Sequence, residues 1–152
     1  MAAPDQRWHP DVTVATVVVR DGRLLQVEEA IGGRLVINQP AGHLEPDESL
    51  LEAALRETFE ETGWKVRLTH YVGSYQWTAG SGRCYLRFAF AAEALQHDPD
   101  ARLDEGIVRA LWMTPEELRG AGERLRSPLV WQVAADYLAG QRHPLSLVRY
   151  LG

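Results

Sequence analysis

The chain has 152 residues, the size of one compact domain, with 45% hydrophobic and 24% charged residues. Cys84 is its only cysteine, which excludes an intramolecular disulfide and a multi-cysteine metal site. The formal net charge of −5 argues against general binding to nucleic acid or to an anionic membrane. No apolar run approaches the ~18 residues that span a bilayer, and the N-terminus lacks the apolar core of a secretory signal. We therefore expect a cytoplasmic protein.

The N-terminal part of the chain predicts three strands followed by a loop. Residues 11–20 are β-branched and largely apolar, which predicts a buried strand. A tight turn at Asp21–Gly22 leads into a second strand over 23–30, and a third strand is predicted over 34–38. Residues 38–49 contain two prolines and a glycine and predict a loop.

A helix is predicted over residues 50–62. Ser49 and Glu52 form a capping box at its start, and Gly63 is well placed to end it. Three more strands and two more helices are predicted over 65–79, 83–95, 106–114, 114–121 and 127–140. This order predicts a mixed α/β sandwich in a single domain, 11–152, after a flexible N-terminal segment, 1–10.

Three acids, Glu57, Glu60 and Glu61, gather on one side of the predicted helix. At roughly 100° per residue they lie opposite a predicted core stripe made of Leu51, Leu55, Thr58, Phe59 and Thr62. Ala53 and Ala54 share the face of the acids and leave room for a ligand. A solvated polar face is one explanation, since like-charge neighbours cost only ~0.2–0.5 kcal/mol each. The other is a shared divalent cation such as Mg²⁺, which prefers hard oxygen ligands.

The spacing of the acids distinguishes between these explanations. The stretch from Gly42 to Trp64 resembles the signature of the Nudix hydrolases, G-x5-E-x7-R-E-U-x-E-E-x-G-U, where U is a bulky apolar residue. The matching fixed positions of this Nudix box are Gly42, Glu48, Arg56, Glu57, Glu60, Glu61 and Gly63. The sequence departs from the pattern only at the U positions, where Thr58 and Trp64 stand.

The resemblance implies a fold, a reaction and a metal. Nudix proteins are α/β/α sandwiches around a mixed sheet, and they cleave a diphosphate joined to another moiety by water attack at phosphorus with Mg²⁺ or Mn²⁺. Glu57, Glu60 and Glu61 would be the metal-binding and catalytic acids, and Arg56 would orient them. Gly42 would offer its backbone carbonyl to the metal. Three later acids are candidates for a further metal ligand or the general base, with a plain surface role as the alternative: Glu93, Asp104 and Glu105.

The resemblance extends beyond the box to a phosphatase member of the family, over most of the chain from about Asp11 to Leu145. It implies hydrolysis of nucleoside di- and triphosphates with stepwise release of orthophosphate, action on the thiamin-precursor pyrimidine diphosphate, and a monomer. Two alternatives stay open. One is a pyrophosphate-releasing Nudix hydrolase, and the other is a non-catalytic Nudix module that binds nucleotide.

Several side chains outside the box are candidates for contact with the substrate. Trp77 could stack on a base or pyrimidine ring, and Arg87 and Arg126 could each fork onto phosphate oxygens. Asn38 and Gln76 complete the candidate set. For Trp77 the alternative is core packing, and for the arginines it is a surface ion pair.

Overall fold

A computed structural model describes residues 7–152, so most of the predicted N-terminal segment 1–10 lies outside the described residues. Within residues 7–152 the chain forms seven strands and three α-helices, with two short 3-10 helices at Gly122–Arg124 and Leu145–Leu147. The strands are β1 (Asp11–Arg20), β2 (Arg23–Ile31), β3 (Arg34–Asn38), β4 (Ala41–His43), β5 (Trp64–Thr78), β6 (Cys84–His97) and β7 (Ile107–Met113). The α-helices are α1 (Leu50–Thr62), α2 (Pro115–Gly120) and α3 (Pro128–Leu138). None of the helices in this part of the chain is long and apolar enough to cross a membrane.

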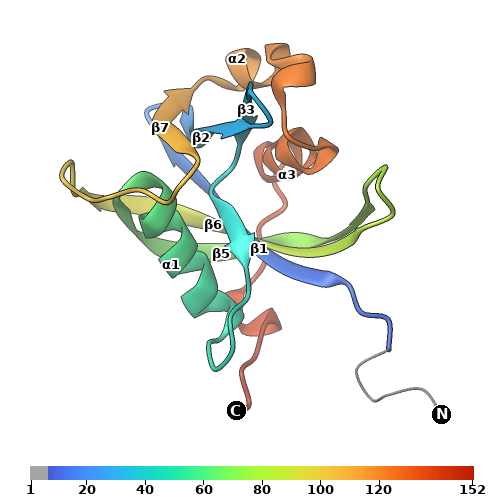
Figure 1. The fold of residues 1–152 in the computed structure, drawn as a ribbon. Coiled ribbons are helices and arrows are strands. Elements are labelled where there is room, and N and C mark those ends of the chain that lie inside the picture. The colour runs from blue at the N-terminus through green and yellow to red at the C-terminus, as the bar shows by residue number, and fades with distance from the viewer. Residues whose placement is uncertain (1–6) are drawn as a thin grey trace.

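The strands form a mixed sheet around β1. Its main path has the order β3-β2-β1-β6-β5, while β4 pairs with β1 and β7 pairs with β2. The β1–β6 pair is parallel, with Thr13 opposite Arg87, and the other strand pairs are antiparallel. Figure 1 shows the long β5–β6 hairpin extending away from the helices. The parallel pair explains why residues far apart in the sequence meet at one end of the sheet.

Helices cover both faces of this sheet. Side chains of a strand alternate between the two faces, so β1 contributes to a core on each side. In β1, Val14 and Val18 belong to a core cluster with Ala53 and Ala54 of α1. Val17 points the other way, into a second core cluster that includes residues of α2 and α3. In Figure 1, α1 and α3 lie on opposite sides of the central strands. The α/β sandwich with a mixed sheet that the sequence predicts is therefore confirmed.

The element boundaries differ from the predicted ones mainly in the loop before α1. Residues 38–49 contain the three-residue strand β4, which the sequence did not predict. β4 pairs with Thr13, Val14 and Ala15 of β1. Its formation depends on this partner strand, since three residues carry too little periodicity to predict a strand. The pairing holds Gly42 in place beside α1.

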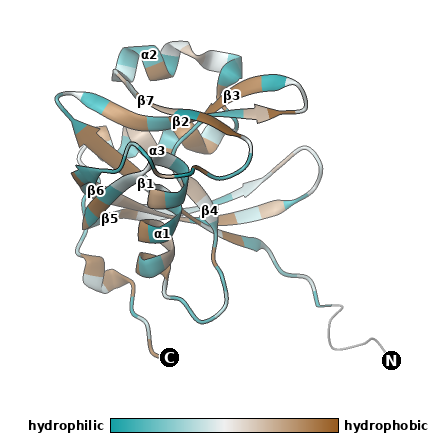
Figure 2. Ribbon diagram, turned by 60° about the vertical axis from the view of Figure 1, so that its left-hand side comes forward, coloured by the Kyte–Doolittle hydropathy of each residue, from teal (hydrophilic) through white to brown (hydrophobic). Residues whose placement is uncertain are grey.

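The predicted core stripe of α1 is wrong in part. Leu55 is 39% exposed, while Ala53 and Ala54 are fully buried rather than open to a ligand. Figure 2 shows polar and apolar segments alternating along α1, as expected for a helix with one buried face. The helix packs against the sheet through its small residues, because alanine allows a closer approach than leucine. The buried face of α1 is thus rotated from the predicted one, and it also includes Glu61, which the sequence placed on the side of the helix away from the core.

Candidate active site

Capping residues determine both ends of α1, and Gly42 of β4 leaves room for the Glu57 side chain of this helix. The Ser49 side chain accepts a hydrogen bond from the Glu52 amide at 3.1 Å, and Gly63 ends the helix in the left-handed conformation at φ 75°. The carboxylate of Glu57 packs directly against Gly42. A Cβ atom on Gly42 would lie 2.1 Å from the carboxyl carbon of Glu57, so only glycine leaves room for this carboxylate.

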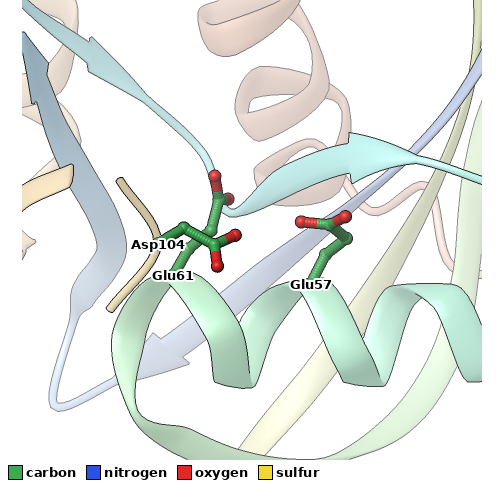
Figure 3. A group of neighbouring side chains, drawn as sticks. All are labelled: Glu57, Glu61 and Asp104. Carbon is green, nitrogen blue, oxygen red and sulfur yellow. The ribbon is translucent and has the colours of Figure 1, made fainter. Parts of the chain in front are cut away.

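Three carboxylates converge at this point. Ligand atoms of Glu57, Glu61 and Asp104 all lie within 4.8 Å of one another. Figure 3 shows the two glutamates rising from successive turns of α1 and Asp104 meeting them from the loop before β7. The Asp104 amide donates to the Glu60 carbonyl at 3.0 Å, which ties this loop to the helix. We call Glu57, Glu61 and Asp104 the acid cluster.

Burial makes this cluster unfavourable for negative charge. Glu61 is 7% exposed and accepts a hydrogen bond from the Ala41 amide at 2.8 Å. Burial raises its pKa to about 8, and the nearby charges of Glu29, Glu57 and Asp104 add to the shift. Burial likewise raises the pKa of Glu57, against the influence of Arg56. The cluster would therefore be stabilised by a cation that keeps its members ionised.

Arg56 forms hydrogen bonds with several carboxylates in and next to the acid cluster. Its Nε and Nη2 atoms donate to the two oxygens of Glu48 at 2.9 and 2.7 Å, a two-point contact that only the guanidinium geometry allows. Its Nη1 atom donates to Glu57 at 2.8 Å and to Glu60 at 3.1 Å. These contacts raise the pKa of Arg56, through Glu48 above all, and hold the pKa of Glu48 low. Arg56 thus contacts Glu57, and the orienting role that the resemblance implies for Arg56 stays a prediction.

Other predicted acids lie outside the cluster. The Glu60 side chain is 40% exposed and is held by Arg56, so its part in metal binding stays a prediction. Glu93 forms an ion pair with Arg67 across the β5–β6 strands. Glu105 is exposed beside Asp104. Of the three later acids, the structure brings only Asp104 to the acids of α1.

A cleft of about 270 Å³ opens beside the acid cluster. Ala41 and Gly42 line it and also contact the acids, Ala41 through its amide to Glu61 and Gly42 through the Glu57 carboxylate. Four of the five residues proposed from the sequence for substrate contact line this cleft: Asn38, Trp77, Arg87 and Arg126. Gln76 does not line it, and its amide faces Cys84 Sγ at 3.8 Å. In a strand, neighbours point to opposite faces, so Trp77 and Gln76 cannot share one side.

The sequence did not predict several other residues in this cleft or next to it. Tyr85 stacks on Trp77, with ring centroids 5.6 Å apart and planes at 19°, because the two are opposite each other in the β5–β6 register. Arg83 and Thr13 also line the cleft. Glu29 is buried at 6% exposed and pairs with Arg126. Alternation along the predicted strands would have placed Tyr85 and Arg87 on one face, which was the available signal.

The acid cluster fits a divalent cation of the Mg²⁺ type. Its ligands are all oxygens, as Mg²⁺ and Mn²⁺ prefer. Opposite ligands of one Mg²⁺ lie about 4.2 Å apart, twice the usual metal–oxygen distance, and the cluster spans a comparable distance. The raised pKa values of Glu57 and Glu61 indicate that their ionised forms are disfavoured at this position unless a cation offsets the charge.

The fold and the site define a Nudix protein. The model of the NUDIX domain matches residues 8–132, and the chain belongs to this family. Phosphatase NudJ of Escherichia coli K12 is 46% identical to it over 141 residues, which cover 93% of this chain and 92% of that protein. The same identity and coverage hold for Phosphatase NudJ of Shigella flexneri. The chain is thus a hydrolase closely related to NudJ, and the resemblance read from the sequence is confirmed.

A solved structure supports the same assignment. A NUDIX hydrolase from Nitrosomonas europaea superposes with a TM-score of 0.92 at 46% identity, covering 94% of this chain and 98% of that chain. The agreement extends over nearly the whole of both chains. It confirms the Nudix fold independently of the box residues.

Proposed function

We propose that this protein is a Mg²⁺-dependent phosphohydrolase, with Mn²⁺ as a possible substitute. Its proposed substrates are nucleoside tri- and diphosphates and the thiamin-precursor pyrimidine diphosphate, from which it releases orthophosphate stepwise. The observation that carries this proposal is the likeness to Phosphatase NudJ along nearly the whole chain, together with an intact box. We further propose that residues 11–152 act as one catalytic domain, as a monomer in the cytoplasm.

The acid cluster would hold the cation. Glu57, Glu61 and Asp104 offer carboxylate oxygens, and we propose that Glu60 and the Gly42 carbonyl join them when the site is loaded. A bound divalent cation neutralises the charge of the diphosphate and lowers the pKa of a water bound to it. Arg56 keeps Glu57 in position through its contacts with Glu48 and Glu57.

The cleft would hold the substrate while water attacks. In this reaction the water oxygen forms a bond to phosphorus, the phosphoanhydride bond breaks, and one carboxylate of the acid cluster accepts the proton of the water. Trp77 and Tyr85 present stacked rings on which a base or pyrimidine can lie. Asn38, Arg87 and Arg126 supply donors to phosphate oxygens from the same cleft.

A product assay tests this proposal. The protein is incubated with Mg²⁺ and GTP, GDP or the pyrimidine diphosphate, and orthophosphate and pyrophosphate are scored separately. Orthophosphate from GTP and again from GDP is the expected result. Pyrophosphate from GTP would replace the proposal with a pyrophosphate-releasing Nudix activity. No product from any of the three, with Mg²⁺ bound, would favour another substrate or a non-catalytic binding role.

A further inference from the structure

The cleft beside the acid cluster has a closed floor and an open rim. Its floor consists of residues that are each less than 9% exposed: Thr13, Asn38, Ala41, Arg87 and Leu129. Its rim carries half-buried aromatic rings, Trp77 and Tyr85, and the exposed Arg83. A ligand whose ring stacks on Trp77 and Tyr85 would share the cleft with Arg87, which lies in its floor.

Arg87 is a buried cation in this floor. Its side chain lies on β6 opposite Thr13 of β1, and its Nε donates to the Thr13 hydroxyl at 3.3 Å. Its Nη1 atom is buried and has no hydrogen-bond partner among residues 7–152. Burial and the neighbouring Arg126 lower the pKa of Arg87 to about 10, so the guanidinium stays charged at neutral pH. A buried charged group with an unpaired donor is costly, and an anionic ligand would supply an acceptor for Nη1.

Arg126 adds a second guanidinium to the same cleft. Its amide donates to the Ile37 carbonyl at 2.9 Å, which fixes the backbone beside β3. Its side chain, 49% exposed, pairs with the buried carboxylate of Glu29, and Asn38 donates to that carboxylate at 3.5 Å. Glu29 thus offsets the charge of Arg126, whereas Arg87 forms no ion pair within residues 7–152.

We propose that Arg87 and Arg126 bind the free terminal phosphate of the substrate, and that this subsite selects against diphosphates esterified at both ends. A terminal phosphate carries between one and a half and two negative charges at neutral pH, whereas an internal phosphate ester carries one. It also has three free oxygens for forked contacts and no substituent to clash with the closed floor. This proposal rests on the proposed function, since it concerns the substrate of the same site.

Binding of orthophosphate to the metal-free protein tests the subsite without catalysis. Isothermal titration in EDTA compares the wild type with Arg87→Met, Arg126→Met and the control Arg109→Met, whose exposed side chain pairs with Glu28 away from the cleft. We expect orthophosphate to bind the wild type and Arg109→Met equally, and at least tenfold more weakly to the two cleft variants. Equal affinity in all four proteins, or no binding to the wild type at millimolar phosphate, would overturn the proposal. Should Arg87→Met fail to fold, Arg126→Met, at a half-exposed position, decides.

Substrate preference provides the second measurement. The ratio of kcat/KM for GDP to that for a GDP-sugar should favour GDP in the wild type and fall at least tenfold in Arg126→Met. An unchanged ratio would overturn the proposal while leaving hydrolysis of GDP, and so the proposed function, intact. Conversely, orthophosphate binding that depends on the two arginines, in a protein that releases no orthophosphate from nucleotides, would sustain the subsite and refute the proposed function.

Discussion

Replacing Gly42 with alanine tests the position of the Glu57 carboxylate, which we propose to bind the metal. Gly42 does not have a left-handed backbone, so alanine is compatible with its conformation. The new Cβ would lie 2.1 Å from the carboxyl carbon of Glu57 and 2.3 Å from each carboxylate oxygen. Ordinary carbon contacts are about 3.5–4.0 Å, so the carboxylate has to move by more than about 1 Å. The clash falls on the end of a flexible side chain, which can swing away.

The two consequences of this substitution differ in size. The stability change should stay within about 1 kcal/mol, because no backbone has to move and glycine is not favoured in strands. Activity should fall about 100-fold, since a displacement of about 1 Å in a catalytic group costs this much. Glu57 would also move away from Arg56 Nη1, which donates to it at 2.8 Å.

Orthophosphate release with Mg²⁺ and urea unfolding measure the two effects on the same preparations. Gly120→Ala is the matched control, because a Cβ at Gly120 meets no atom within 4 Å. We expect the control to keep wild-type activity and stability. Activity of Gly42→Ala within threefold of the wild type would refute the reasoning that the site requires Glu57 against Gly42. A large loss of stability would instead show that the side chain cannot relieve the clash.

Three further predictions concern the interior of the site and its support. Thr58→Val should destabilise the fold by about 1–3 kcal/mol in urea unfolding, because the buried hydroxyl of Thr16 loses its partner at 2.8 Å. The double variant Thr16→Val/Thr58→Val should recover most of this loss, and no recovery would contradict the hydrogen-bond account. Arg56→Lys should lower kcat at least tenfold, because lysine cannot make the two-point contact with Glu48; near-normal turnover would count against it. Finally, burial raises the pKa of Glu61 from its ordinary value of 4.5 to about 8. Between pH 4.5 and pH 8, the metal-free folded protein therefore keeps a proton on Glu61 that the unfolded chain has released. In EDTA the unfolding free energy should therefore fall as pH rises from 4.5 to 8, by up to about 1.4 kcal/mol per pH unit, and Glu61→Gln should flatten the curve. Parallel curves for the two proteins would exclude a raised pKa at Glu61.

The local part of the site is predictable from short-range signals. Ser49 and Gly63 mark the ends of α1 because caps act within a few residues of the helix end. The order of Arg56, Glu57 and Glu61 along the helix is a matter of spacing alone, and the structure keeps Arg56 in contact with Glu57. The contact of Arg56 with Glu48 was not predicted, because Glu48 lies before the helix and meets it only when the loop folds back.

The buried face of α1 illustrates where pattern reading fails. Leu55 and Ala53 are both apolar, so the periodicity allows either to face the sheet. Which of the two is buried depends on how closely the helix approaches the strands. Where the approach is close, the small alanine faces the sheet and the leucine does not. Thr58 takes an apolar position of the box because Thr16 of β1 supplies the hydroxyl partner that makes its burial tolerable.

The sequence by itself therefore determined the family, the order of the elements apart from β4, and the acids carried by α1, because each depends on residue types at fixed short spacing. Only the tertiary structure decided that Asp104 joins Glu57 and Glu61, that β4 holds Gly42 beside them, and that Arg87 and Arg126 share one cleft. Asp104 comes from a loop, Arg87 from β6 and Arg126 from the segment before α3. Strand order and register bring them together, and spacing along the chain does not encode either.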